Sequence, residues 1–280
     1  MTSNLAWHGF SFTLPHGWEI TAYRLDPRRG EFRFHQRLID RAQLTWVRMA
    51  GRPDIEGLAR DITDRQLRSA GRDKVGAEVV KHGPWLVAHA ARGEPFQALT
   101  WIAHDQRLLH WTFPAWEGDD ADLPWRTLLA SLVADPGDTL RWELFGTAVL
   151  LPRRFAAVEV DARPGVVRIE YADSAGVSVT VRRFGLARSL LAERQLSSWL
   201  RRSMFADKGR IDQVQETVRG GCPAVRAAFS IIGERTFDRV AWRRWPGEAW
   251  WWHDEARNRI LAIEQVGPPK APRVEFSHAG

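Results

Sequence analysis

A short apolar motif occurs twice in this chain, and the repetition constrains the fold more than any other feature of the sequence. The first occurrence is Phe12-Thr-Leu-Pro15-His-Gly-Trp18 and the second is Val149-Leu-Leu-Pro152-Arg-Arg-Phe155. Both have alternating apolar residues, then Leu-Pro, two small or polar residues and one aromatic residue. At the same offset, Gly9 aligns with Gly146. The sequence therefore predicts two copies of one module of about 140 residues, a usual size for one domain.

The boundaries of these modules follow from turn-forming residues. Pro136-Gly137-Asp138 interrupts the pattern between the copies, and Gly267-Pro-Pro-Lys-Ala-Pro follows the last strand-like segment. We therefore expect a first module at residues 1–137, a second module at 138–266, and a flexible or docking tail at 267–280.

Hydrophobic periodicity predicts the secondary structure of the first module. Pro53-Asp54 precedes an apolar stripe that ends before Gly71, which indicates a helix, and Pro124 starts a second helix with Trp125, Leu128, Leu129, Leu132 and Val133 on its buried face. Alternating or β-rich segments predict strands at residues 10–14, 31–36, 43–49, 77–81, 85–91, 95–103 and 107–113.

The second module repeats this order. We expect one helix over residues 187–206 and a hairpin turn at Pro246-Gly247. Strands are expected at residues 147–151, 166–171, 177–184, 215–219, 224–232, 236–245, 249–253 and 259–266. The predicted fold class is α+β, with two tandem repeats, each a mainly antiparallel sheet packed with one long helix.

The order of elements, the Phe12–Trp18 motif, and Leu109-His-Trp-Thr-Phe113 followed by a helix ending in Ser131-Leu132 resemble the Mog1/PsbP-like family. This family includes the DcrB-like group and related secretion-effector chaperones. The resemblance covers most of both copies, although the second copy has no closing helix. Because members mostly bind proteins or small assemblies, it implies an adaptor or chaperone-like binding protein and assigns no catalytic residue. It also implies that the fused copies pair as a pseudo-dimer.

Composition and charge narrow the class of protein only modestly. Cys222 is the single cysteine, so an internal disulfide is excluded, and the N-terminal residues lack a basic segment followed by an apolar one. No apolar run approaches the ~18 residues of a membrane span. We therefore expect a cytoplasmic protein. Lys/Arg and Asp/Glu balance at 18 each in residues 1–141, whereas residues 142–280 carry 22 and 16. This excess suits an acidic partner or a nucleic acid, although six spare charges are also ordinary for a solvated surface.

Motifs for catalysis, cofactors or metals are not found in the sequence. The closest histidine pairs, His82 with His89 and His104 with His110, do not have the spacing of a helical zinc pair. Cys222 lies in a Gly-Gly-Cys-Pro turn, which favours a structural or incidental thiol over a nucleophile. Phosphate-binding glycine motifs are also absent. We expect no enzymatic activity, no cofactor and no metal.

The candidate functional site is the Arg/Trp-rich segment between residues 242 and 253. Tryptophan and arginine dominate the energetic centres of protein interfaces, so we expect a protein-binding surface here. Strand alternation places Trp251 on the face opposite Trp250 and Trp252, so at least one tryptophan belongs to the core. The candidate interface residues are Trp242, Arg243, Arg244, Trp245, Trp250 and Trp252.

Two alternatives remain open at this point. The same Arg/Trp segment could stack bases and hold phosphates. That interpretation predicts nucleic-acid binding that collapses with added salt, and with Arg243→Glu and Arg244→Glu together, in a fluorescence-anisotropy titration; salt-independent binding would contradict it. The second alternative is a ligand-binding protein or enzyme with a pocket between the modules.

Overall fold

The computed structural model describes residues 3–26, 28–69, 71, 78–89, 94–115, 124–203, 210–232 and 244–269. The chain forms two compact units. The first comprises Met1–Gly137 with Trp142–Gly146, and the second comprises Asp138–Arg141 with Thr147–Gly280. The boundary between the two units therefore lies near Gly137, although the short segment Trp142–Gly146 belongs to the first unit.

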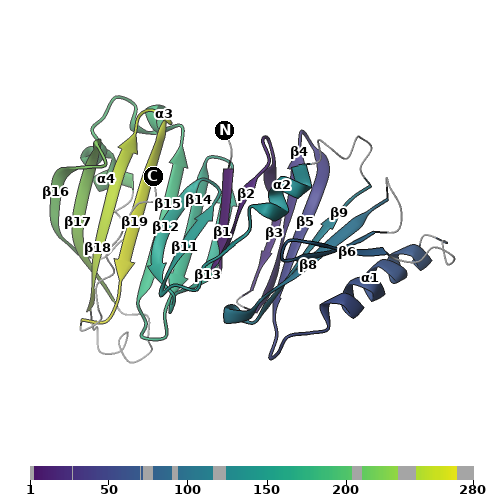
Figure 1. Cartoon of the computed structure of the whole chain (residues 1–280). Helices are drawn as coiled ribbons and strands as arrows, with labels where there is room; N and C mark the ends of the chain where they lie inside the picture. Colours follow the sequence, from purple (N-terminus) through teal and green to yellow (C-terminus); the bar gives the residue numbers. More distant parts are fainter. Residues whose placement is uncertain are drawn as a thin grey trace. The chain divides into compact units, whose positions relative to one another are not determined.

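The first unit contains a seven-stranded antiparallel sheet in the order β3-β4-β5-β9-β8-β7-β6 and a smaller sheet in which β10, β2, β1 and β11 are neighbours (Figure 1). Its elements are β1 (Ser3–Trp7), β2 (Phe10–Leu14), β3 (Glu19–Leu25), β4 (Arg29–Gln36), β5 (Ile39–Arg48), α1 (Ile55–Ser69), β6 (Glu78–His82), β7 (Trp85–His89), β8 (Phe96–Ile102), η1 (Ala103–Asp105), β9 (Arg107–Phe113), α2 (Pro124–Ala130), β10 (Val133–Ala134) and β11 (Thr139–Leu144).

Aromatic side chains fill the space between these two sheets. Phe12 of β2 meets Trp111 of β9 edge to face, with ring centroids 5.3 Å apart, and Trp7 of β1 meets Phe32 of β4 at 5.9 Å. All four are at most 2% exposed. Offset and edge-to-face pairs of this kind add stability beyond the burial of their area. The alternation predicted at residues 10–14 is therefore confirmed as a strand whose apolar face is in the core.

The other face of the seven-stranded sheet carries α1, which lies against β6, β7 and β8. Beside the helix, His110 Nε2 is 2.6 Å from Gln97 Oε1, and Gln97 Nε2 donates to Gln66 Oε1 of α1 at 2.8 Å. Because an amide oxygen only accepts, His110 must be the donor, which fixes its neutral tautomer. Burial lowers the pKa of His110 to about 4.

The second unit contains a seven-stranded antiparallel sheet in the order β13-β14-β15-β19-β18-β17-β16. Numbered from its first strand, this sheet has the same strand order as that of the first unit. The elements are β12 (Thr147–Pro152), β13 (Ala156–Arg163), β14 (Val166–Ala172), β15 (Ser178–Gly185), α3 (Ala187–Leu191), α4 (Leu196–Ser203), β16 (Arg210–Arg219), β17 (Cys222–Ile232), β18 (Arg244–Asp254) and β19 (Arg259–Val266).

The predicted arrangement of two repeats that each pack one long helix is wrong. The chain is mostly antiparallel strand in three sheets, and its helices are few and short. The helix expected over residues 187–206 is two short helices, because Ala192 and Glu193 adopt left-handed backbone conformations with φ of 46° and 65°. Leu191, before this turn, and Leu196, after it, converge on one core.

The predicted closing helix of the first module is also shorter than expected. It ends at Ala130, and Val133 belongs to β10, where its side chain is 59% exposed. Trp125, Leu128 and Leu129 are buried as predicted. The pairing of β10 with β2 takes the segment after Ala130 away from helical geometry.

Pro246 and Gly247 do not form the predicted hairpin. They lie inside the continuous strand β18, in register with Ser230 and Phe229 of β17. A Cβ atom on Gly247 would lie 2.5 Å from Phe229 Cε2 and Cζ, so the glycine provides room for the buried Phe229 ring and not for a turn. The part of the predicted strand 236–245 that precedes Arg244 and the tail beyond Pro269 lie outside the described residues.

Gly247→Ala should destabilise the chain, because its methyl group would overlap the Phe229 ring in a close-packed core. Overpacking of this kind costs about 1–3 kcal/mol. Urea denaturation followed by circular dichroism measures this cost. Gly185→Ala is the matched control, since the nearest atom to its Cβ would be 3.6 Å away. Equal stabilities of the two variants would contradict the packing described for Phe229.

His110→Gln should flatten the loss of stability in acid. Between pH 6.5 and about 4 the unfolded chain binds a proton at His110 that the folded chain does not bind, so the free energy of unfolding falls as pH falls. This one group contributes a slope of up to about 1.4 kcal/mol per pH unit. Urea unfolding at pH 4.5 and 7 measures it, with exposed His104→Gln as control. Identical slopes for the parent and His110→Gln would exclude this role.

Candidate interaction surface

Four of the six predicted interface residues lie on β18, and the strand divides them between its two faces. Trp245 lies on the face that α3 and α4 cover, where it is 7% exposed. Arg244, Trp250 and Trp252 lie on the opposite, outward face. Trp242 and Arg243 lie outside the described residues. The structure therefore brings Trp250 and Trp252 together, with Trp252 itself buried at 4% exposed, whereas Arg244 lies on the same face six residues from Trp250 along the strand.

Trp251 belongs to the core on the helix-covered face, as strand alternation predicts. Its ring stacks on Phe184 of β15 with centroids 6.0 Å apart and meets Trp199 of α4 at 6.2 Å. Its exposed fraction is 0%. Burial of this indole fixes which way the neighbouring Trp250 and Trp252 must point.

Arginines from two neighbouring strands contact the outward tryptophans. The Arg219 guanidinium carbon, at the end of β16, is 5.2 Å from the centroid of Trp250 and 4.9 Å from that of Trp252. Arg226 of β17 is 5.2 Å from the centroid of Trp250. Burial lowers the pKa of Arg219, although an arginine remains cationic at any ordinary pH. These are cation–π contacts, which are favourable at partly desolvated sites.

Glu248 completes the arrangement. Its Oε1 atom accepts a hydrogen bond from Arg226 Nε at 2.7 Å and another from Trp250 Nε1 at 3.0 Å. One carboxylate therefore fixes both the guanidinium and the indole. We refer to the set of five side chains as the Arg/Trp face: Arg219, Arg226, Glu248, Trp250 and Trp252.

A hollow of about 250 Å³ adjoins the Arg/Trp face. Gln213 and Gln215 of β16 form one side of it, and Arg226 and Glu248 form the other. Its floor includes Ala228, which is in register with Glu248 and whose small side chain leaves this space. The surface therefore combines a fixed aromatic group with an adjacent recess lined by polar groups.

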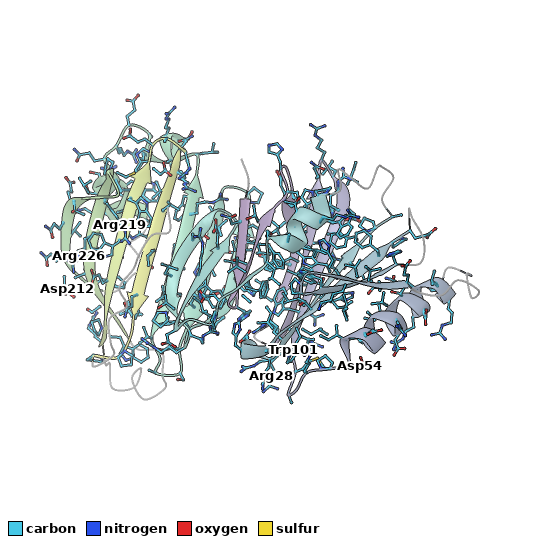
Figure 2. All side chains as sticks on the ribbon, viewed as in Figure 1. Arg28, Asp54, Trp101, Asp212, Arg219 and Arg226 are labelled. Carbon is cyan, nitrogen blue, oxygen red and sulfur yellow. The ribbon has the colours of Figure 1, made fainter. Side chains whose placement is uncertain are left out.

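The sequence analysis did not identify Arg219, Arg226 or Glu248 as site residues. Their strands were predicted, but the register that aligns Arg226 with Trp250 is a tertiary property. Figure 2 labels Arg219 and Arg226, which come from β16 and β17. A partial signal was present, because Arg226 alternates with the apolar residues Val225 and Ala227 and so had to face outward from β17.

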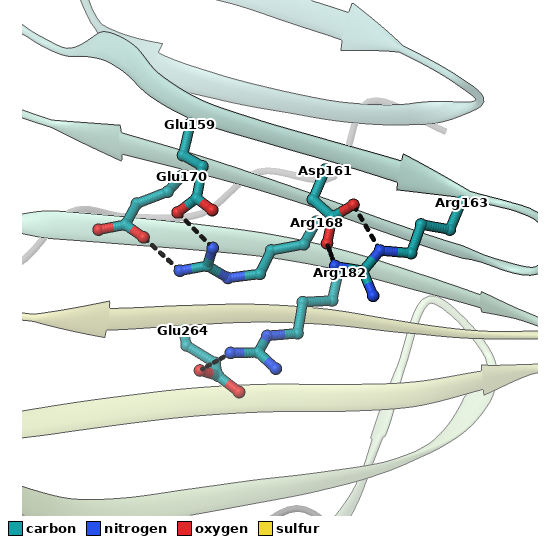
Figure 3. Close-up of polar contacts among 7 residues, drawn as sticks. All are labelled: Glu159, Asp161, Arg163, Arg168, Glu170, Arg182 and Glu264. Atoms are coloured by element: carbon teal, nitrogen blue, oxygen red, sulfur yellow. Dashed lines mark hydrogen bonds and ion pairs between the residues drawn. The ribbon is translucent and has the colours of Figure 1, made fainter.

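A second charged cluster lies on β13, β14, β15 and β19 of the same sheet (Figure 3). The strand register places it on the face opposite the Arg/Trp face, because Arg182 aligns with Ala262 and Ala262 with Trp251. Arg168 pairs with Glu159 at 2.5 Å and also with Glu170, and Arg182 pairs with Glu264 at 3.6 Å. The remaining pair in Figure 3 is Arg163 with Asp161. Most of these pairs join neighbouring strands, so the cluster stabilises the sheet.

The described part of the chain contains no group of three or more His, Cys, Asp or Glu side chains that could hold a metal ion. Cys222 is a partly exposed free cysteine at the start of β17. Among the helices that the structure describes, none has the length and apolar character to cross a membrane.

Comparisons with known proteins give distant structural likenesses. No family model and no curated protein matches the sequence. A crystal structure from Bacteroides thetaiotaomicron VPI-5482 is 15% identical, with a TM-score of 0.30; the match covers 51% of this chain and 53% of that chain, so this chain spans about half of it. The apo structure of the immunity protein TplEi of the T6SS from Pseudomonas aeruginosa is 10% identical, with a TM-score of 0.37, over 97% of this chain and 89% of that chain.

Sequence identities and TM-scores this low assign neither a family nor a function to the chain. Neither structure is a Mog1/PsbP-like protein by name, so that resemblance remains a prediction.

Arg219→Gln should lower the free energy of unfolding by about 1 kcal/mol, because it removes the cation from two indole rings at once. Chemical denaturation measures the change. Arg202→Gln, at an exposed position of α4, is the control and should change stability by less than about 0.5 kcal/mol. If both variants have the stability of the parent, the contacts of Arg219 contribute nothing measurable.

Proposed function

We propose that this chain is a non-enzymatic binding protein, of the adaptor or chaperone-like kind, which docks an acidic protein surface on its Arg/Trp face. The observation that carries the proposal is the fixed position of Trp250. Two arginines lie against its ring and Glu248 accepts its indole N–H, yet the side chain remains partly exposed on an outward sheet face.

The energetics of such a surface favour protein recognition. Tryptophan and arginine are the residues most often found at the centres of protein interfaces. Binding costs free energy when mobile side chains become ordered, and the contacts of Trp250 with Arg226 and Glu248 have already ordered them. A partner therefore meets a rigid surface and keeps more of the contact free energy.

Charge indicates the chemistry of the partner. The outward face of β16 to β18 carries three arginines, Arg219, Arg226 and Arg244, beside Glu248, and Asp212 is exposed near the start of β16. The basic excess of the chain also falls in residues 142–280. Carboxylates on a protein partner would approach the guanidinium groups, and an apolar or aromatic side chain would cover Trp250.

Nucleic acid suits this face less well than protein. A phosphate approaching Arg226 would meet the carboxylate of Glu248 2.7 Å away from the same guanidinium. A base stacking on Trp250 would have to displace one of the arginines already against the ring. The first cost applies to a protein carboxylate as well, so the second distinguishes the two partners, because a protein side chain can pack on the exposed part of Trp250 and leave both arginines in place.

The test is affinity capture from lysate of the source organism with three tagged forms: the parent, Arg226→Glu, and Arg163→Glu. Arg163 is 75% exposed and lies on the opposite face of the same sheet, so it controls for net charge. We expect one or a few stoichiometric proteins with the parent and with Arg163→Glu, and at least a tenfold lower yield with Arg226→Glu, since reversed charge at an interface centre costs several kcal/mol.

The captured protein should also survive nuclease treatment. Equal capture by Arg226→Glu and the parent would exclude the Arg/Trp face as the docking surface. Loss of all captured protein after nuclease would favour the nucleic-acid alternative.

A further inference from the structure

The two seven-stranded sheets match in register as well as in strand order. The hairpin loop between β8 and β9 consists of residues 103–106, and the loop between β18 and β19 consists of residues 255–258. The two loops have the same length, and both end on a residue with a left-handed backbone, Gln106 with a φ of 49° and Asn258 with a φ of 50°. Positions in one sheet can therefore be matched with positions in the other by counting from these loops.

In the first unit, α2 covers one end of the sheet face that lies opposite α1. The ring of Trp125 in α2 meets Phe96 of β8 at 5.0 Å and Phe113 of β9 at 6.5 Å. The backbone carbonyl of Leu129 in α2 accepts a hydrogen bond from Trp85 Nε1 of β7 at 3.0 Å. This helix therefore shields three aromatic side chains of the sheet, each at most 8% exposed.

The corresponding face of the second unit is the outward face of β17, β18 and β19. Phe96 is paired with Phe113 across β8 and β9, and the matched positions in β18 and β19 are Glu248 and Gln265, which are also paired. The helices α3 and α4 pack on the other face, in one core with Trp251. Among the described residues of the second unit, no helix lies over Glu248 and Gln265 as α2 lies over the two phenylalanines.

The hollow of about 250 Å³ lies at this place. Glu248, the counterpart of Phe96, lines it together with Arg226, and the exposed side chains of Gln213 and Gln215 form its other side. Amide side chains both donate and accept hydrogen bonds, and a guanidinium donates them. The second unit thus has a polar recess where the first unit has an aromatic surface under a helix. An occupant must supply hydrogen-bonding groups as well as shape.

We propose that the docked partner presents a short helix to this hollow, in the place that α2 takes in the first unit. The inference rests on the proposed docking function and specifies the form of the docked segment. The α2 helix has seven residues, which is about 10 Å of helix, so two turns are long enough. Arg219 and Arg226 beside Trp250 favour an acidic side chain on that helix, and Gln213 and Gln215 favour polar side chains next to it.

The experiment is photo-crosslinking with the full chain in lysate of the source organism. The photoreactive residue p-benzoylphenylalanine replaces Gln213, Gln215 or Arg163, one at a time, and the crosslinked peptides are identified by mass spectrometry. We expect both hollow positions to react with one segment of the captured protein, at sites three, four or seven residues apart, because such residues share one face of a helix. The position of Arg163, on the opposite sheet face, should react at least tenfold less.

Other occupants give different crosslinks. Sites two residues apart would indicate an extended segment added to the edge of β16 and would overturn the helix. Reaction only with residues 270–280 of the same chain would overturn it as well. If neither hollow position reacts although Arg226→Glu still abolishes capture, the inference fails and the docking function stands. If Arg226→Glu captures as well as the parent, the docking function fails with it.

A variant that fills the hollow gives a second readout. Gln215→Trp should lower the yield of captured protein at least tenfold, because the indole occupies the space that the partner helix needs. Arg163→Trp, on the opposite face, should leave the yield unchanged. Gln215 is exposed on an edge strand, so the larger side chain does not enter the core, and circular dichroism checks that the fold is retained. Full capture by Gln215→Trp would overturn the inference.

Discussion

The alternation of side chains along β18 is the constraint on which the second unit depends. Three consecutive tryptophans cannot all face one side of a strand. Trp251 takes the helix-covered face, where Phe184 and Trp199 pack against it, and this burial commits Trp250 and Trp252 to the other face. A shift of one residue in the register of β18 would place two indoles in a core built for one. The burial of Trp251 thus determines which side chains of β18 point to the outward face.

The outward face follows from that orientation and from the neighbouring strands. With Trp250 pointing outward, the pairing of β17 and β18 brings Arg226 beside it, and Glu248 two residues earlier accepts from both. These hydrogen bonds join side chains of two neighbouring strands. The other face of the same sheet packs against α3 and α4, where Leu191 and Leu196 meet in one core across the turn between the helices. One sheet therefore carries two chemically different faces, one with arginines against indole rings and one with an apolar core under the helices.

Individual strands were predictable because their apolar residues alternate and because Gly and Pro mark their ends. The strand at Phe10–Leu14, the helix after Asp54 and the position of Trp251 in the core all follow from local patterns. Prediction failed where local pattern and packing disagree. Pro246-Gly247 is typical of a turn, yet it lies inside β18. A glycine is needed there because a side chain would overlap the Phe229 ring. The segment 187–206 has a pattern typical of one helix, yet it forms the two helices α3 and α4. The left-handed turn between them brings Leu191 and Leu196 to one core.

The sequence by itself determined that strands dominate between Gly and Pro boundaries, that basic residues are in excess in residues 142–280, and that consecutive tryptophans must divide between two faces. These are properties of neighbouring residues, because periodicity and charge are local. Only the tertiary structure decided that Arg219, Arg226 and Glu248 surround Trp250, and that Leu191 and Leu196 meet in one core. Those groups lie on different strands and helices, and only the strand register and the path of the α3–α4 turn bring them together.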